Sequence, residues 1–145
     1  MDERLNILVV EDDGIYADFV ASTLRAAGHE AAVASTAAEA RKHVQSGRTD
    51  GVILDLGLPD ESGYDLARDL RAHLLPAATI IILLTASLYP ERDLATAVGI
   101  DMVLTKPVEA ELVHGMVEFI RTRRGRGAAG GEGRPAPSPS LPRRR

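Results

Sequence analysis

The sequence predicts an α/β fold, in which one parallel sheet of five strands carries helices on both faces. Five short aliphatic runs alternate along the chain with five segments of helical character, a pattern typical of parallel strands joined by helical crossovers. The connections between them are short, as such folds require. At 145 residues and 45% hydrophobic composition the chain can bury one core, and its 3% aromatic content means that this core is aliphatic.

Each predicted strand is a run of aliphatic residues, as expected for parallel strands that are buried on both faces. The run at residues 80–84 is the most hydrophobic of the chain, which favours a central position in the sheet. The predicted strands are residues 5–10, 31–34, 52–54, 80–84 and 102–104.

The helices are predicted from apolar periodicity and from residues that start and stop helices. Ser35 or Thr36 caps the second helix, and glycine ends three of them, at Gly28, Gly47 and Gly99. The expected spans are residues 15–27, 36–45, 62 or 63 to just before Pro76, 90–99 and 108–123. The last helix has an expected buried stripe of Leu112, Val113, Met116, Val117 and Ile120.

Charge is distributed unevenly along the chain. Residues 1–120 contain 9 Lys/Arg and 20 Asp/Glu, a net charge of −11, whereas residues 121–145 contain 8 Arg and one Glu, a net charge of +7. The acidic part should therefore repel nucleic acid. Residues 124–145 contain 5 Gly, 4 Pro and 6 Arg, which predicts a disordered basic tail after a folded domain of residues 1–123.

Several classes of protein are excluded by composition. The chain contains no cysteine, so disulfides and thiolate chemistry play no part. The first residues do not resemble a signal peptide, and no apolar run is long enough to span a membrane. A cytoplasmic location is the expectation.

Polar side chains follow four of the predicted strands, at the point where each strand ends. They are the acidic run Glu11, Asp12 and Asp13, then Asp55, Thr85 and Lys106. Carboxyl ends of parallel strands lie at one edge of a sheet, where ligands of open α/β folds bind. Three carboxylates so close together need positive charge to remain ionised, which Lys106 and a divalent ion would provide. Oxygen ligands without His or Cys favour Mg²⁺ or Mn²⁺. Such an ion can bind both carboxylate and phosphoryl oxygens, so phosphate is the expected ligand.

Each of these residues also has an ordinary interpretation. The acidic run could be a solvated turn or a helix cap, Thr85 a plain strand residue, and Lys106 a surface residue. The matching order of all four strand ends favours a single site instead.

In these motifs the sequence resembles the response-regulator receiver domain of bacterial two-component signalling, over about residues 5–122. The resemblance implies a flavodoxin-like (βα)5 receiver fold, and because no second folded domain is expected after it, we expect a stand-alone, single-domain protein. It is carried by residues 7–13, 52–59, Gly63, 84–86 and 105–107.

By this resemblance Asp55 is the phosphoacceptor, and a histidine kinase or histidine phosphotransfer protein is the donor. Asp12, Asp55 and the backbone carbonyl of Gly57 would bind Mg²⁺ directly, and Glu11 would act through a metal-bound water. Lys106 would pair with one phosphoryl oxygen and Thr85 with another. The resemblance also implies a cis peptide between Lys106 and Pro107.

Gly57 and Ser87 occupy family positions that tune hydrolysis of the aspartyl phosphate. Both are small here, which predicts an open path for water and a short-lived phosphoryl state. One departure from the family concerns output. Many receivers have Tyr or Phe at the position of Val103, and this aromatic side chain turns inward when the residue at the position of Thr85 closes on the phosphoryl group. We therefore expect output through ordering of the loop around Thr85 and Ser87.

Alternatives to the phosphoacceptor switch come from other classes. An aspartyl-nucleophile phosphatase carries an Asp-x-Asp pattern, but Gly57 occupies its second position, so no enzyme activity is expected beyond self-phosphorylation and dephosphorylation. The Arg-rich tail could act as a constitutive electrostatic module that contacts acidic surfaces. No helix-turn-helix, other DNA-binding domain or second folded domain is expected, so output would be a protein contact or onward phosphotransfer.

Overall fold

The computed structural model describes residues 4–129, with side chains through Arg124. Its sheet has five strands, β1 (Asn6–Val10), β2 (Glu30–Ala34), β3 (Gly51–Asp55), β4 (Ile80–Thr85) and β5 (Met102–Thr105). All neighbouring strands pair in parallel, in the order β2-β1-β3-β4-β5. This is the flavodoxin-like order, so the predicted fold class is confirmed.

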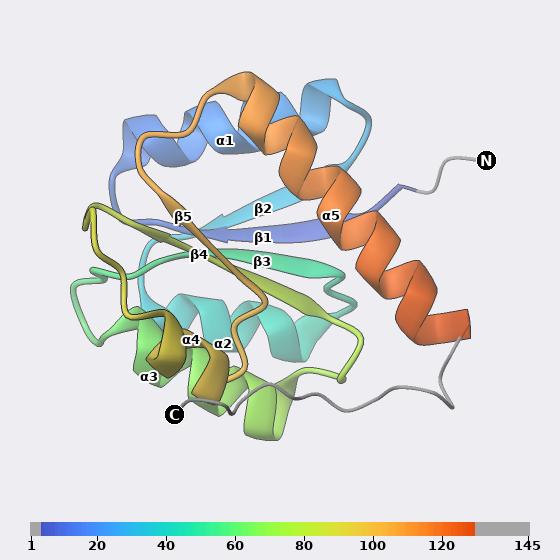
Figure 1. The fold of residues 1–145 in the computed structure, drawn as a ribbon. Coiled ribbons are helices and arrows are strands. Elements are labelled where there is room, and N and C mark those ends of the chain that lie inside the picture. The colour runs from blue at the N-terminus through green and yellow to red at the C-terminus, as the bar shows by residue number, and fades with distance from the viewer. Residues whose placement is uncertain (1–3, 130–145) are drawn as a thin grey trace.

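Helices cover both faces of this sheet (Figure 1). α1 and α5 lie on one face, and α2, α3 and α4 lie on the other. After α3 the chain continues as a π-helical segment, η1. The bounds are α1 (Gly14–Ala26), α2 (Ala37–Ser46), α3 (Gly63–Asp69), η1 (Leu70–Leu74), α4 (Arg92–Ala97) and α5 (Ala110–Ala129).

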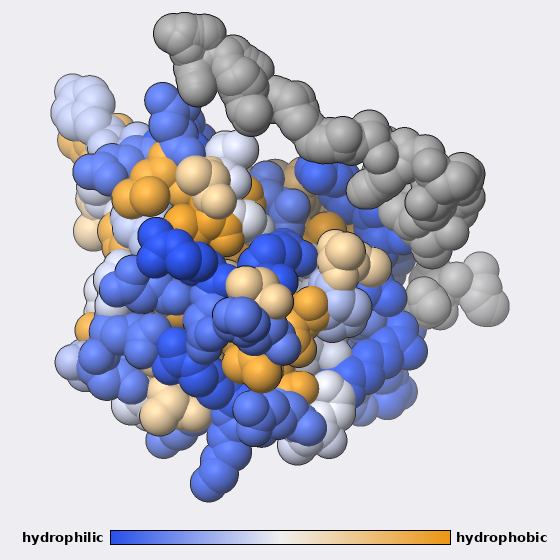
Figure 2. Space-filling model, turned by 90° about the horizontal axis from the view of Figure 1, so that it is seen from below, coloured by the Kyte–Doolittle hydropathy of each residue, from blue (hydrophilic) through white to orange (hydrophobic). Residues whose placement is uncertain are grey.

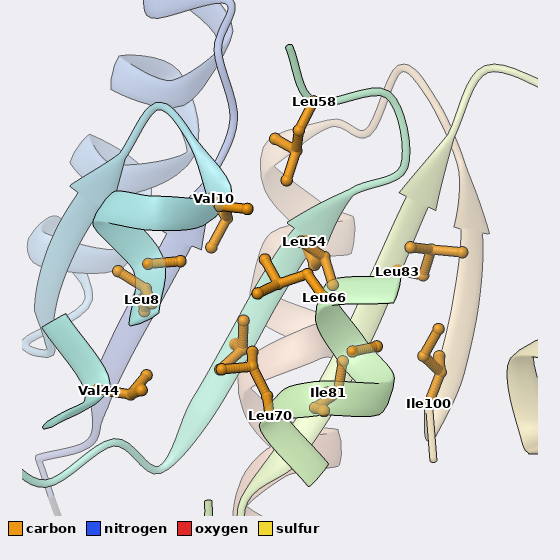
Figure 3. Packing of buried hydrophobic residues seen from close by; sticks show 14 of the residues in the cluster. Leu8, Val10, Val44, Leu54, Leu58, Leu66, Leu70, Ile81, Leu83 and Ile100 are labelled. Carbon is orange, nitrogen blue, oxygen red and sulfur yellow. The ribbon is translucent and has the colours of Figure 1, made fainter. Parts of the chain in front are cut away.

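The sheet separates two aliphatic clusters, because successive side chains of a strand point to opposite faces. Leu8, Leu54 and Leu83 pack toward α2, α3 and α4, as Figure 3 shows. Ile53 and Ile82 belong to the opposite cluster, with α1 and α5. Every residue of β3 and β4 is buried, which holds the carboxyl ends of these two strands rigidly in place.

The outer surface over α2, α3 and α4 is mostly hydrophilic, with separate apolar patches (Figure 2). None of the helices that the structure describes is both long and apolar enough to cross a membrane.

The predicted buried stripe of α5 is wrong at one position. Leu112 is 40% exposed, whereas Val113, Met116, Val117 and Ile120 are buried. These four residues follow the spacing i, i+3, i+4 and i+7, which already forms a complete apolar face. Leu112 lies about 100° around the helix from Val113 and points away from the sheet.

The end of α5 also differs from the prediction. The helix was expected to end at residue 123 but continues to Ala129, so the predicted start of the tail at residue 124 falls inside it. The side chains of Arg123 and Arg124 reach Asp101 and Asp50 at distances of 3.8 and 3.1 Å. These contacts favour helix where the Gly and Arg composition alone favoured a tail. The remainder of the predicted tail, residues 130–145, lies outside the described residues.

Candidate functional site

Three carboxylates meet at the carboxyl edge of the sheet. β1 and β3 are neighbours, with Val10 paired to Leu54, so the residues that follow, Glu11 and Asp55, are brought side by side. Together with Asp12 they offer carboxylate oxygens that all lie within 4.8 Å of one another. Glu11 and Asp55 are buried and Asp12 is exposed, so the cluster opens to solvent on the side of Asp12.

Lys106 reaches into this cluster from the end of β5. Its Nζ donates to Glu11 Oε1 at 3.0 Å and to Asp55 Oδ1 at 3.2 Å. The backbone N–H of Lys106 donates to the Thr85 carbonyl at 2.8 Å, and its peptide with Pro107 is cis. The lysine predicted from the sequence is thus the counter-charge of the two buried carboxylates.

The pKa values of this group reflect burial and mutual pairing. Burial raises the pKa of Glu11, and the N–H of Asp13 and the ammonium of Lys106 oppose part of that rise. Burial alone would lower the pKa of Lys106, but its hydrogen bonds to Glu11 and Asp55 raise it overall. Lys106 is therefore a permanent cation at neutral pH, which suits it to hold a second anionic group.

Thr85 lies at the same edge of the sheet, because β4 is paired with β3 on the side opposite β1. Its side chain is buried, and its Oγ1 accepts a hydrogen bond from the Ser87 N–H at 3.1 Å. Ser87 Oγ in turn accepts from the Tyr89 N–H at 3.1 Å. A chain of hydrogen bonds therefore runs from Thr85 into the exposed loop after β4.

Val103 does not lie at this edge. It pairs with Leu83 inside the sheet and packs against the aliphatic cluster under α2, α3 and α4. A valine side chain there fills core space in a strand that is half-buried along its length.

Glycines keep the segment after Asp55 close to the site. A Cβ on Gly63 would lie 2.7 Å from the Asp55 carbonyl oxygen and 2.8 Å from Leu56 Cα, so only glycine fits this approach. A Cβ on Gly57 would meet nothing closer than Asp55 Oδ2 at 4.0 Å. Apart from its two chain neighbours, Gly57 thus leaves space beside Asp55, while the predicted open path for water stays a prediction.

The chemistry of these donors fits a hard divalent cation. Carboxylate oxygens from Glu11, Asp12 and Asp55 are grouped tightly enough to hold one metal ion, and such oxygens suit Mg²⁺ or Mn²⁺. Lys106 supplies one positive charge beside them, which leaves a net negative site.

Residues 7–118 match the family model of the response regulator receiver domain. The chain belongs to this family. The solved structures of receivers agree: CheY4 of Vibrio cholerae has a TM-score of 0.76 at 28% identity, covering 81% of this chain and 99% of that one. A CheY-like receiver domain protein of Methanospirillum hungatei has a TM-score of 0.77 at 26% identity, covering 86% and 100%.

Relatives of the receiver include proteins of different overall design. The aerobic respiration control sensor protein ArcB of Escherichia coli is 32% identical over 119 residues, which cover 79% of this chain and 15% of ArcB. The transcriptional regulatory protein PhoP of Escherichia coli is 30% identical over 119 residues, 82% of this chain and 53% of PhoP. The chain thus spans about half or less of the length of these relatives.

One residue of the site was missed by reasoning from the sequence. Tyr16 lies under Lys106, with 4.9 Å from Nζ to the ring centroid, and its OH accepts from the Val108 N–H at 2.9 Å. Asp13 is the N-cap of α1 and accepts from the Ile15 and Tyr16 N–H groups. The cap interpretation thus holds for Asp13, the last member of the acidic run. The only sequence signal for the contact of Tyr16 with Lys106 was its position in the first turn of the helix that follows the acidic run.

Proposed function

We propose that this receiver is a phosphoacceptor switch, in which Asp55 takes a phosphoryl group from the phosphohistidine of a histidine kinase or a histidine phosphotransfer protein. The observation that carries the proposal is the pairing of Asp55 with Lys106 beside Glu11 and Asp12, in a chain that belongs to the receiver family. A nucleophilic carboxylate, a cation and a hard-metal site are the parts that phosphoryl transfer needs.

In this mechanism an Asp55 carboxylate oxygen attacks phosphorus, and the bond to the histidine nitrogen breaks. Asp12, Asp55 and the Gly57 carbonyl would hold Mg²⁺, with Glu11 acting through a bound water, and the ion would supply positive charge beside the phosphoryl oxygens. Lys106 exchanges part of its pairing with Asp55 for one phosphoryl oxygen, and the Thr85 hydroxyl donates to another. The tyrosine ring beneath Lys106 keeps the ammonium directed into the site.

Hydrolysis of the aspartyl phosphate then resets the switch, and the protein transforms no other substrate. The uncrowded Gly57 and the short, exposed Ser87 support access of water and a short-lived phosphoryl state. A lifetime of many hours for the phosphorylated protein would contradict this part of the proposal.

The decisive test is labelling with radioactive acetyl phosphate. We expect Mg²⁺-dependent labelling of the wild-type chain, its loss in the presence of EDTA, and no labelling of Asp55→Asn. Equal labelling of Asp55→Asn, or none of the wild type, would refute the proposal.

Output is proposed to be a protein contact or onward phosphotransfer that depends on Asp55. The competing function, a constitutive electrostatic module in residues 124–145, lies mostly outside the described residues, and Arg124 is occupied by Asp50. Salt-sensitive binding that persists in Asp55→Ala and vanishes on deletion of residues 130–145 would favour the competing function.

A further inference from the structure

The segment between Asp55 and α3 carries the Gly57 carbonyl, the one backbone group in the proposed metal site. We call residues 56–62 the β3–α3 loop. The Gly63 N–H donates to the Leu56 carbonyl at 2.8 Å, and Gly57 and Ser62 form an isolated antiparallel bridge. These contacts close the base of the loop but leave the direction of its tip to other contacts.

The tip of the loop is attached to α2, which carries none of the proposed site residues. Asp60 accepts from the Ala37 N–H at 2.9 Å and from the Ala38 N–H at 3.1 Å, one amide to each carboxylate oxygen. Thr36, the local cap, satisfies only the Glu39 N–H. Asp60 therefore completes the N-terminus of a helix that is more than twenty residues away in sequence.

A second attachment comes from Arg41, one turn further along α2. Its two terminal nitrogens donate to both carboxylate oxygens of Glu61, at 3.0 and 2.7 Å, and its Nε donates to Asp69 at 2.7 Å. The side chains of Arg41, Glu61 and Asp69 are only 29%, 26% and 35% exposed. Such a bidentate, partly buried pair fixes geometry better than an exposed one.

Leu58 secures the loop from inside. It is 9% exposed and points from the loop toward the sheet (Figure 3), where it belongs to the same aliphatic cluster as Leu54. The loop is thus bound at its base, by an apolar anchor and by two acidic residues at its tip, and both acidic residues are held by the same helix.

We propose that Asp60 and Arg41 are positioning residues, which hold the β3–α3 loop against α2 and thereby set the Gly57 carbonyl for metal binding. This inference rests on the proposed function, because it assigns a task to the metal site of the receiver. Groups that orient the ligands of a metal commonly change its affinity 10–100-fold when they are removed. Here the oriented ligand is one of several, so a smaller change is expected.

The experiment compares metal binding of the full-length wild type with Asp60→Ala and Arg41→Met by isothermal titration calorimetry with Mg²⁺. The expected result is a dissociation constant raised about 3- to 10-fold in each variant. Labelling of Asp55 by acetyl phosphate should need correspondingly more Mg²⁺, while its rate at saturating Mg²⁺ stays within about twofold of the wild type. A purely structural role would not separate these two quantities.

Arg68→Ala is the matched control, because Arg68 pairs with Asp65 on the exposed side of α3 at 3.3 Å, without touching the loop. It should leave Mg²⁺ affinity unchanged. If either main variant does not fold by circular dichroism, Glu61→Gln replaces it, since it weakens the Arg41 contact and keeps the Asp60 cap.

Unchanged Mg²⁺ affinity in folded loop variants, with normal binding and labelling of the wild type, would overturn the inference alone. A fall in labelling at saturating Mg²⁺ without a change in affinity would also overturn it. Absence of both binding and labelling in the wild type would instead overturn the proposed function, and the inference with it.

Discussion

Lys106 balances charges that come from distant parts of the sequence. Its ammonium lies 3.0 Å from Glu11 and 3.2 Å from Asp55, and its side chain is 23% exposed. Its charge is needed because both carboxylates are buried, and burial without a partner would cost several kcal/mol. The same pairing holds the ammonium directly beside Asp55.

Replacement of Lys106 by methionine tests this balance in metal-free buffer. Lys106 lowers the pKa of Glu11, which burial has raised above 4.5, so the variant should raise that pKa further. Around this pKa the Glu11 carboxyl binds more protons in the folded than in the unfolded state. Its contribution to the free energy of unfolding is therefore present below pH 4.5 and is lost as the pH rises through the folded-state pKa of Glu11. We expect a loss of about 1–3 kcal/mol in unfolding free energy at pH 7 and a smaller loss at pH 4.5.

Urea denaturation at a series of pH values measures this effect. The control is Lys42→Met, which removes an exposed lysine of α2 and should not change the pH dependence. Parallel stability curves for Lys106→Met and the wild type would show that Lys106 does not interact with Glu11 in solution.

At the scale of elements, α3 approaches the site more closely than any side chain at its first residue would allow. Gly63 begins α3, and Ser62 caps it by accepting from the Tyr64 N–H at 3.0 Å. The backbone of Gly63 rests directly on Asp55 and Leu56. The helix therefore forms part of the wall behind Asp55, the proposed phosphoacceptor.

Gly63→Ala should displace this wall. The new methyl group would lie 2.7 Å from a backbone oxygen that cannot rotate away, so we expect a destabilisation of about 1–3 kcal/mol and slower labelling of Asp55. Gly14→Ala at the start of α1 is the control, because nothing lies within 4 Å of its Cβ. It should be neutral or slightly stabilising. Equal thermal melting of the two variants would contradict the close approach.

Elements of this chain differ in how far their sequence predicts them. The strands and the residues that end them are predictable, because parallel strands require aliphatic runs and the polar residues Asp55, Thr85 and Lys106 interrupt those runs at the right places. The contact of Arg41 with Glu61 joins residues that are 20 apart in sequence, and no local sequence pattern predicts it. The extension of α5 was missed for the same reason, since the partner of Arg124 is Asp50.

At the scale of the whole molecule, the two ends of the parallel strands differ in how far their acidic residues are neutralised by basic side chains. At the carboxyl edge, Glu11, Asp12 and Asp55 outnumber the charge of Lys106. At the opposite edge, the fully buried Asp50 accepts from the Asn6 N–H and pairs with Arg48 and Arg124. Asp101 likewise pairs with Arg71 and Arg123. That edge is neutralised by the protein itself and fastens the end of α5 to the sheet.

Truncation should reveal this fastening. Deletion after Glu118 removes the buried Ile120 and one of the two arginine partners of each aspartate, Arg124 of Asp50 and Arg123 of Asp101, so we expect a loss of about 3–5 kcal/mol or more. Deletion after Ala129 keeps all of these contacts and should leave the melting temperature unchanged. Arg124→Met should cost about 1–3 kcal/mol. Equal melting temperatures for the two truncations would contradict the role of the α5 end.

Activation is expected to order the backbone of residues 86–99. Thr85, which accepts a hydrogen bond from the Ser87 N–H, would connect the site to this segment. With beryllofluoride as a phosphoryl mimic, hydrogen exchange at the Ser87 and Tyr89 amides should slow, and Asp55→Asn should show no such change. Unchanged exchange throughout residues 86–99 would mean that output does not pass through this loop.

The pairing of β1 with β3 has a consequence for folding. Glu11 and Asp55 are separated by more than forty residues and meet because these two strands are adjacent, so a fragment that lacks either strand cannot gather the ligands. An ion that prefers the gathered ligands has little affinity for the unfolded polypeptide, and each tenfold excess over its dissociation constant adds about 1.4 kcal/mol to folding. Bound magnesium would then raise the free energy of unfolding of the protein even before any signal reaches it.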